Sequence, residues 1–454
     1  MQHTNFILFT YILTAGSMLR EMYIREVPDE PGKEVKIGGW IERLKVLKNV
    51  KFAWLSDRTG TIQITFAKDK VSTDLFQLFD TFNLHDFLVV TGSTPENKMS
   101  KAHKEVIPKE VKILSKAAKP LPIDMTGAVE SDLETRLNWR SIALRNPKLM
   151  AVLKVESSLV EGMENYLNRK GFTIVFTPSI IGVAAEGGSE VFPIVYYDKT
   201  TYLRQDPQLH RQLLMVAGLD KIYEIGPSWR AELSHTPRHL SEHRTCAAEL
   251  SFIEDEHDVM HVEEELIQAA LKNVAEKNKY ELELLGKEVT VPKLPLPELR
   301  FPDIYDLLKE LGKDLPEGKD LDHESELLLA KYVKEKYNSE LFFINRFPYA
   351  IKPFYVMRVD EDPKYARSID LIYKGVELSS GGQREHRYEK IIEQAKEKGI
   401  HMETIEWFAK FFKYGAPPHG GFSIGIERTV MQLLDMPNIL ETVAFPRTPE
   451  RIVP

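Results

Sequence analysis

The sequence contains a single cysteine, Cys246, and no apolar segment long enough to span a membrane. One cysteine excludes an internal disulfide framework and a cysteine-based zinc site, and it is typical of a reducing cytoplasm. The apolar stretch NFILFTYILTAGS has no positive charge before it, unlike a secretion signal. We therefore expect a cytoplasmic protein without a membrane partner, in which residues 1–21 form a disordered leader.

The chain also lacks an excess of positive charge. It has 60 Lys and Arg against 68 Asp and Glu, a formal net charge of −8, which argues against a generic binder of polyanions. A nucleic-acid surface would then have to be a local basic patch. The cations of residues 36–51 form such a patch, and they are Lys36, Arg43, Lys45, Lys48 and Lys51, against Glu42 alone.

The pattern of short apolar segments divides the chain into two folded parts. Residues 22–117 contain five segments typical of strands, with one helical segment before the fourth, which predicts an OB-fold barrel. Residues 118–145 are rich in proline and polar residues and predict a hinge. Residues 146–454 mix helices and strands without regular alternation. This favours an α+β fold with a mainly antiparallel sheet over a doubly wound parallel sheet.

The stretch SWRAELSHTPRHLSEHR, which begins at Ser228, concentrates cationic side chains in an acidic protein. They are Arg230, Arg238, Arg244, His235, His239 and His243, against two glutamates. Arginine presents a planar fork of donors suited to phosphate oxygens, and a polar loop between two strands can close over a ligand. The stretch therefore predicts a phosphate site. The alternative is a solvated hairpin with scattered charge.

Two further segments favour the phosphate site. In PPHGGFSIGIERTVMQLLDM a glycine-rich strand ends at Arg428, and glycine lets a ligand approach the backbone closely. No GK[ST] follows, so side chains must hold the phosphates. GVELSSGGQREHR contains Glu377 and Ser380, which offer the oxygen ligands that Mg²⁺ prefers. The alternative for Glu377 is a carboxylate on a surface strand.

These segments resemble a known family. Pro178 in FTPSII, the block WRAE…TPRHLSEH and the C-terminal GGFSIGIERTVMQLLDMPNILETVAFPRTPERIVP match, in order, the three signature motifs of class II aminoacyl-tRNA synthetases. The segments AEGGSEVFP, DPQLHRQLLM and ELSSGGQREHR narrow the resemblance to aspartyl-tRNA synthetases of the archaeal and eukaryotic type. The resemblance covers nearly everything after residue 30. It implies an OB-fold anticodon-binding domain over 22–117, and a catalytic domain over 146–454 with an antiparallel sheet flanked by helices.

The resemblance implies that ATP and Mg²⁺ bind to particular residues. Arg230 would hold the α-phosphate, Glu232 would place the adenine end, Arg238 and His239 would reach the outer phosphates, Arg428 would grip the γ-phosphate, and Glu377 and Ser380 would bind Mg²⁺. An amino-acid carboxylate attacks the α-phosphorus, which needs no protein nucleophile. Catalysis then depends on positioning and charge stabilisation, with Arg230 and Arg428 as the catalytic residues.

The amino-acid pocket is also implied by the resemblance. Its expected residues are Glu186, Asp206, Gln208, Arg211, Asp370, Ser380 and Arg384. Among them Arg384 would pair with the aspartate side chain, Arg211 stands where lysine is usual, and Glu186 would close over the substrate ammonium. Two cations favour aspartate over asparagine, because a neutral amide would leave one buried arginine unpaired.

Several positions depart from the family pattern. Ala247 replaces an acidic residue that helps to hold the substrate amino group, and Asp206 replaces a serine. Our hypothesis is that Asp206 restores the missing negative charge. The other departures in the catalytic part are His243 for an apolar residue, Ser423 for a glycine and Leu440 for an arginine.

Phe52 and Gln63 match the positions that stack on and hydrogen-bond to the anticodon. The alternative for Phe52 is a core aromatic, because Trp54 would share its face of the strand. Glu42 replaces an aromatic or histidine found near the anticodon, so the sequence leaves open whether tRNA(Asn) is excluded.

The function implied is ATP-dependent ligation of aspartate to tRNA(Asp), with tRNA(Asn) as an open second substrate, in a homodimer with Pro178 at its interface. One alternative is an asparaginyl-tRNA synthetase. The others are a paralogue that acts without charging tRNA and a non-catalytic RNA-binding scaffold. The OB-like domain counts against the paralogue, and intact Arg230, Glu377 and Arg428 count against the scaffold.

Overall fold

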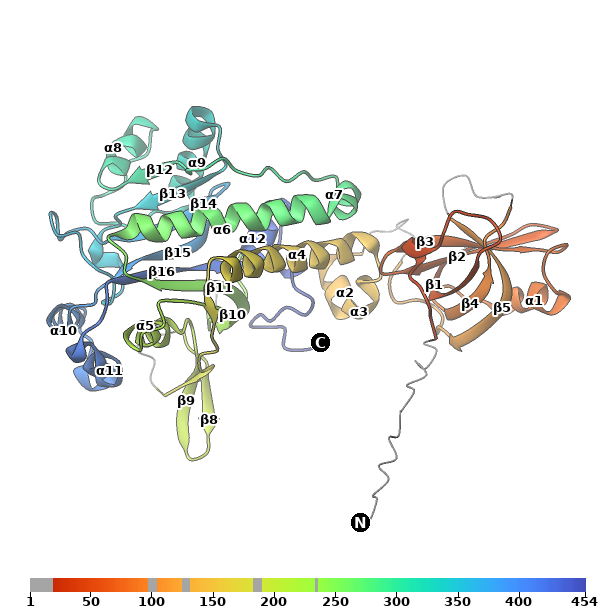
Figure 1. Ribbon diagram of the computed structural model, residues 1–454, viewed down its shortest axis with the longest axis horizontal. Coiled ribbons are helices and arrows are strands. Elements are labelled where there is room, and N and C mark those ends of the chain that lie inside the picture. The colour runs from red at the N-terminus through yellow and green to blue at the C-terminus, as the bar shows by residue number, and fades with distance from the viewer. Residues whose placement is uncertain (1–18, 97–103, 125–130, 183–189, 233–235) are drawn as a thin grey trace, which may run out of the picture. The chain divides into compact units, whose positions relative to one another are not determined.

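The computed structural model describes residues 19–96, 104–124, 131–182, 190–232 and 236–454. The predicted site residue Glu186 lies outside the described residues, as do His235 and most of the predicted leader. The chain divides into two compact units, Met1–Pro147 and Lys148–Pro454, which carry the red to orange and the yellow to blue elements of Figure 1. None of the described helices has the length and apolar character needed to cross a bilayer.

The first unit contains a closed barrel with strand order β1-β2-β3-β5-β4, which confirms the predicted OB-fold. Its strands are β1 (Glu34–Val46), β2 (Val50–Asp57), β3 (Gly60–Ala67), β4 (Phe87–Ser93) and β5 (Glu105–Ser115), and helix α1 (Thr73–Leu78) lies between β3 and β4. Two short helices follow the barrel, α2 (Leu133–Asn138) and α3 (Arg140–Ala143), within the segment interpreted as a hinge. The turn between β2 and β3 is closed by Asp57, whose Oδ1 accepts from the Thr59 backbone N–H at 2.7 Å.

Phe52 is not a core aromatic. The barrel core is formed from β2 by the alternate residues Ala53 and Leu55, which are fully buried. Phe52 and Trp54 point to the other face, where they are half-buried with ring centroids 6.0 Å apart. Gln63 lies opposite Trp54 on β3, but it is buried and donates to Thr65 Oγ1 at 3.0 Å. The two aromatic rings and Gln63 therefore lie on the outer face of β2 and β3.

The predicted basic patch is smaller than its sequence suggests. Lys51 is buried, and its Nζ lies 2.8 Å from Asp80 Oδ1 and donates to the Phe76 carbonyl at 2.9 Å. Its charge is therefore neutralised inside the unit, which corrects its assignment to the patch. Arg43, Lys45 and Lys48 remain exposed along the same stretch.

The second unit is built on an eight-stranded sheet in the order β12-β13-β14-β15-β16-β11-β10-β6. The strands, in that order, are Glu298–Arg300, Leu341–Asn345, Ser368–Tyr373, Val376–Arg384, His419–Gly425, Glu242–Ser251, Lys221–Trp229 and Thr173–Ile174. Only the outer pairs β12–β13 and β10–β6 are parallel, so the predicted α+β fold with a mainly antiparallel sheet is confirmed. A small sheet has the order β7 (Ile180–Ile181), β9 (Lys199–Leu203) and β8 (Pro193–Tyr196).

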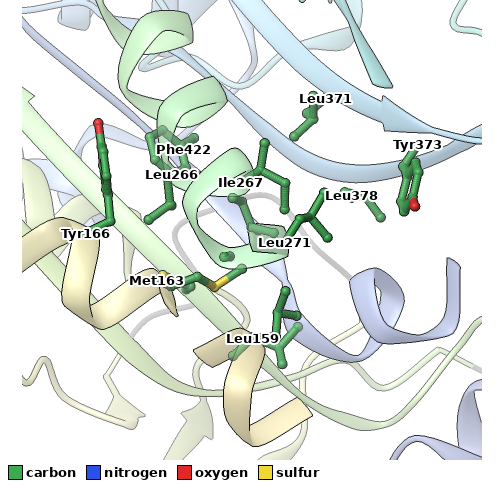
Figure 2. Close-up of a cluster of buried hydrophobic side chains, with 14 of the residues drawn as sticks. Leu159, Met163, Tyr166, Leu266, Ile267, Leu271, Leu371, Tyr373, Leu378 and Phe422 are labelled. Carbon is green, nitrogen blue, oxygen red and sulfur yellow. The ribbon is translucent and has the colours of Figure 1, made fainter. Parts of the chain in front are cut away.

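Helices α4 (Pro147–Arg169) and α6 (Glu256–Lys277) pack on one face of the large sheet (Figure 1). Figure 2 shows Leu159 and Met163 of α4, Leu266 and Leu271 of α6 and Phe422 of the sheet, which belong to one buried cluster. Burying such a side chain contributes about 1.5–3 kcal/mol. The two helices approach closely at Gly162, where an added Cβ would lie 2.7 Å from the Ala270 Cα.

The remaining described helices of the second unit surround the sheet. They are α5 (Gln208–Val216), α7 (Lys279–Leu285), α8 (Asp303–Glu310), α9 (His323–Tyr337), α10 (Tyr388–Glu397), α11 (Met402–Ala409) and α12 (Ile426–Leu433). Helix α12 follows β16 directly, as predicted for the segment GFSIGIERTVMQLLDM. Helix α9 begins at an Asp322 cap, whose Oδ1 accepts from the Ser325 backbone N–H at 2.9 Å.

Glu263 of α6 is a carboxyl group in the core beneath the sheet. It is fully buried and accepts a hydrogen bond from Ser379 Oγ. Burial raises its pKa to about 8, so the folded protein binds a proton there that the unfolded chain releases near pH 4.5. Stability from this group is therefore full below about pH 4.5 and is lost as pH rises through about 8.

We expect Glu263→Gln to remove this pH dependence, because glutamine keeps an acceptor for Ser379 and cannot ionise. Between pH 6 and pH 8.5 the wild-type protein should lose on the order of 2 kcal/mol relative to the variant in urea unfolding. Glu276→Gln, at an exposed position of the same helix, should follow the wild type. Parallel pH profiles of the wild type and Glu263→Gln would exclude a protonated Glu263.

Candidate active site

A cavity of about 250 Å³ lies on the face of the large sheet that turns away from α6. Neighbouring residues of β15 point to opposite faces of the sheet. Ser379 contacts Glu263 of α6 on one face, and Ser380 lines the cavity on the other. The predicted site residues that line it are Asp206, Gln208, Arg230, Glu232, Arg238, His239, Glu377, Ser380, Arg384 and Arg428. The cavity thus joins segments that are up to 222 residues apart in sequence.

Glu377 and Ser380 reach the same cavity because β15 contains a bulge. In a regular strand, residues three apart point to opposite faces. Here Ser379 pairs with Leu371 and Glu377 pairs with Ile372, so Leu378 is an extra residue that shifts the alternation. The Glu377 carboxylate and the Ser380 hydroxyl therefore line one wall, and such oxygen donors suit Mg²⁺.

Arg428 connects the third signature segment to β15. It lies in the first turn of α12, directly after the glycine-rich strand β16. Its Nη1 donates to the Glu377 carbonyl at 3.2 Å and lies 3.9 Å from Glu377 Oε1. The guanidinium and the candidate metal ligand are thus neighbours in the cavity wall.

Arg230 follows the last residue of β10 and lies in the same cavity. Its Nη1 lies 3.3 Å from Glu232 Oε1, and its side chain is 52% exposed. Glu232 Oε2 lies 3.4 Å from His239 Nε2 on its other side. Among the described residues this guanidinium forms one ion pair, which is long, so it retains donors for a ligand.

The cationic character of residues 228–244, the stretch SWRAELSHTPRHLSEHR, is lower than its sequence suggests. His243 lines the cavity, and burial, followed by Arg230 and Arg428, lowers its pKa to about 4. It is therefore neutral at physiological pH. Arg244 does not line the cavity, and its guanidinium lies 3.5 Å from carboxylate oxygens of both Glu242 and Glu427.

Gln208 is the centre of a buried network at the other end of the cavity. Its Oε1 accepts from Arg211 Nη2 at 2.9 Å and from Arg384 Nη2 at 3.1 Å, and its Nε2 donates to Glu249 at 3.0 Å. Arg384 Nε donates to Glu249 Oε1 at 3.1 Å. Arg211 Nη2 lies 2.5 Å from Asp206 Oδ1, and although burial opposes it, Arg211 lowers the pKa of Asp206.

This network corrects the argument that two cations select aspartate. Each arginine already has a carboxylate partner within the protein, Asp206 for Arg211 and Glu249 for Arg384, so a neutral amide would leave neither unpaired. Among the described residues, Nη1 is the nitrogen of the Arg384 guanidinium that donates no hydrogen bond, and Arg384 lines the cavity. It is the group placed to receive a further carboxylate.

Two predicted pocket residues are buried and do not line the cavity. Arg211 donates to Gln208, and Asp370 lies beside Ser380, its partner across the strands. Burial raises the pKa of Asp370 to about 6, and Lys352 Nζ, 3.3 Å away, opposes that shift. Lys352 itself lines the cavity. Sequence reasoning missed it, because a lone lysine in the loop AIKPFY carries no periodic or motif signal.

The small residues that depart from the family pattern lie together on the sheet. Ala247 pairs with Ser423 across β11 and β16, and Ser423 pairs with Ser380 across β16 and β15. Directly opposed residues share one face of a sheet. This row therefore leaves the floor of the cavity free of bulky side chains between Asp370 and Ala247.

Comparison with known families assigns both units. Residues 132–449 match the family described as tRNA synthetases class II (D, K and N). Residues 35–114 match the family described as OB-fold nucleic acid binding domain. The OB-fold match lies within residues 22–117, and the synthetase match begins at residue 132, inside the segment interpreted as a hinge.

Curated relatives align along nearly the whole chain. The Aspartate–tRNA(Asp) ligase of Pyrococcus furiosus is 45% identical over 438 residues, which covers 96% of this chain and 100% of that protein. The Aspartate–tRNA(Asp/Asn) ligase of Methanopyrus kandleri is 40% identical over the same shares of both chains.

Solved structures agree with the fold. The asparaginyl-tRNA synthetase of Pyrococcus horikoshii complexed with asparaginyl-adenylate has a TM-score of 0.90 at 30% identity, covering 96% of this chain and 100% of that chain. The aspartyl-tRNA synthetase of Entamoeba histolytica has a TM-score of 0.85 at 26% identity, covering 97% of this chain and 94% of that chain. From the family match and the full-length relatives, the chain belongs to the class II tRNA synthetases of the aspartate, lysine and asparagine group.

Proposed function

We propose that this protein is an aspartate–tRNA ligase, which forms aspartyl-adenylate from aspartate and ATP and then transfers aspartate to the 3′ end of tRNA(Asp). The observation that carries the proposal is the shared cavity of Arg230, Glu377 and Arg428, which come from three segments far apart in sequence. Relatives of matching length named as Aspartate–tRNA(Asp) ligases support the choice of amino acid.

The phosphates of ATP bind to arginines in this proposal. Arg230 contacts the α-phosphate, where negative charge develops when the aspartate carboxylate attacks the phosphorus. Arg428 and Arg238, with His239, hold the outer phosphates, and Glu232 orients the adenine end. Positioned guanidinium donors stabilise such charge without reorganisation during the reaction.

Mg²⁺ would be held by the Glu377 carboxylate and the Ser380 hydroxyl, whose oxygen donors line one wall of the cavity. When bound, Mg²⁺ supplies positive charge that neutralises phosphate oxygens and favours departure of pyrophosphate. Arg428, bonded to the Glu377 carbonyl, keeps its own charge next to that wall.

The amino-acid end of the cavity would receive aspartate. Arg384 Nη1 pairs with the side-chain carboxylate of aspartate. Gln208, itself bonded to Arg211, holds the Arg384 guanidinium in place. Asp370 holds Lys352, which lines the same cavity. Glu186, outside the described residues, would close over the substrate. Asp206 is the cavity-lining carboxylate at this end, and it would bind the α-ammonium that Ala247 cannot hold.

Asp206→Ser should abolish aspartate binding and leave ATP binding intact, because it removes the negative charge at the ammonium position. Isothermal titration with each ligand separately measures both effects. Asp206→Glu, which keeps the charge, should retain part of the affinity. Unchanged aspartate affinity in Asp206→Ser would refute the role of Asp206.

An asparaginyl-tRNA synthetase is the second candidate. Two observations favour it: the balanced charges around Arg211 and Arg384, and the likeness to an asparaginyl-tRNA synthetase structure at a TM-score of 0.90. Sequence identity favours the aspartate enzymes, at 45% over the full length of the Pyrococcus furiosus protein.

The tRNA would bind through the outer face of β2 and β3. Phe52 and Trp54 offer rings on which bases stack, a contact worth about 1–3 kcal/mol per base in such barrels. Gln63, beside Trp54, would hydrogen-bond a base edge after releasing Thr65. Exposed Arg43, Lys45 and Lys48 would contact the phosphates.

Charging of transcripts tests the complete reaction. Radiolabelled aspartate should be transferred to tRNA(Asp) transcript, and transfer to tRNA(Asn) transcript as well would place the protein with its Asp/Asn-named relatives. Transfer of asparagine alone would establish the second candidate.

We also propose a homodimer, joined near Pro178, where Phe176 is 83% exposed. Light scattering should then give twice the chain mass of 52.2 kDa.

A further inference from the structure

Arg238 and His323 meet at the rim of the cavity, although they are 85 residues apart in sequence. Arg238 Nη1 lies 3.0 Å from His323 Nδ1. A guanidinium has no acceptor, so the imidazole nitrogen must accept, and the ring proton is on Nε2. His323 is the first residue of α9, so the capped start of a helix of 15 residues fixes the position of the ring.

Arg238 has an imidazole as its partner, whereas the other two arginines expected to bind phosphate, Arg230 and Arg428, have carboxylates. Arg230 lies beside the Glu232 carboxylate, and Arg428 lies beside the Glu377 carboxylate. Within the described part of the chain, no carboxylate forms an ion pair with Arg238. A neutral imidazole therefore holds this guanidinium without cancelling its charge, while its other donors stay available in the cavity.

The surroundings of His323 are consistent with a neutral ring. Partial burial, followed by the Arg238 charge, lowers its pKa, while Asp322 opposes the shift. Glu326, one turn along α9, has Oε2 3.5 Å from the same Nδ1, which is too long for a good hydrogen bond. Arg238 is thus the closer contact of Nδ1.

We propose that His323 is a positioning residue that orients Arg238 toward the outer phosphates of ATP. The inference rests on the proposed function, in which Arg238 binds those phosphates. Holding a long side chain in its bound orientation lowers the entropy lost when the ligand binds. A neutral acceptor achieves this and leaves the attraction between Arg238 and the phosphates at full strength. A carboxylate in the same place would weaken that attraction.

Substitution of His323 should change nucleotide affinity more than the rate of the chemical step. His323→Ala should raise the KM for ATP in pyrophosphate exchange by about 3- to 10-fold, as expected for loss of one partly exposed hydrogen bond. The kcat should change by less than about twofold, since this contact is the same in the ground and transition states. His323→Asn should restore most of the affinity, because its amide oxygen takes nearly the place of Nδ1.

Matched controls separate positioning from a general effect on α9. Glu324→Ala alters the same helical turn and removes the ion pair with Lys313, so it should keep the wild-type KM. In the Arg238→Ala background, His323→Ala should have no further effect on the KM, because the positioned group is absent. Thermal unfolding of every variant checks that α9 remains folded.

Three results would overturn the inference while leaving the proposed function intact. They are a wild-type KM in His323→Ala, an equal loss in His323→Asn and His323→Ala, or an undiminished effect of His323→Ala in the Arg238→Ala background. Calorimetric titration of the wild-type protein with Mg-ATP identifies the other kind of failure. If the wild type binds no ATP, the proposed function and the role of His323 fall together.

Discussion

Arg230→Ala is expected to lower the rate of aspartate-dependent ATP–pyrophosphate exchange by at least about 10²-fold, the loss typical of removing one donor from a developing oxyanion. The side chain is half exposed and forms one long ion pair within the described part of the chain, so we expect its removal to cost little stability. The KM for ATP should rise less than kcat falls, because the charge on the α-phosphate grows in the transition state.

Steady-state exchange kinetics measure this effect. Arg230→Lys should recover only part of the rate, since an ammonium keeps the charge but not the planar fork. Arg169→Ala, at the exposed end of α4, should behave as the wild type. Exchange within about threefold of the wild type in Arg230→Ala would remove this residue from the catalytic centre.

Arg384→Ala is expected to cause two separate losses. It removes the group that receives the aspartate side chain, and it leaves Glu249 without its arginine at a fully buried position. Breaking a buried pair on one side typically destabilises a protein by about 3–5 kcal/mol. Aspartate-dependent exchange should therefore disappear in a protein with a markedly lower unfolding temperature.

The double variant Arg384→Met with Glu249→Gln separates the two losses. It removes both charges and keeps a hydrogen-bonding partner for Gln208, so most of the lost stability should return. Aspartate-dependent exchange should stay absent, while titration with Mg-ATP should still show binding. Recovery of aspartate-dependent exchange in this stable double variant would show that Arg384 does not bind the substrate.

The sequence was sufficient for the fold because the local patterns are strong. The turn DRTG joins two alternating strands of the barrel, and GFSIGIERTVMQLLDM passes from a strand to a helix at Gly425, as the structure has it. Each of these segments carries its own periodicity, which needs no knowledge of distant partners. The resemblance then placed the segments within one family.

The details of the site could not be predicted in the same way. The bulge at Leu378 decides that Glu377 and Ser380 share a wall, and it is visible only in the pairing of β15 with β14. Glu249 and Arg384, two of the three partners of Gln208, are 41 and 176 residues away from it, so the charge balance around Arg384 has no local signature. The sequence places Lys51 in a basic patch, because its ion pair with Asp80, 29 residues away, has no local signal.

The measurement that tests the central claim most directly is ATP–pyrophosphate exchange with aspartate and with asparagine, run in parallel on the wild-type protein. The central claim is that one nucleotide contacts Arg230, Arg428 and Glu377 together, while Arg384 faces the carboxylate of the amino acid. This claim predicts pyrophosphate exchange that depends on aspartate and is far slower with asparagine. Exchange with asparagine alone would contradict the choice of substrate. No exchange with either amino acid would contradict the assignment of this cavity to amino-acid activation.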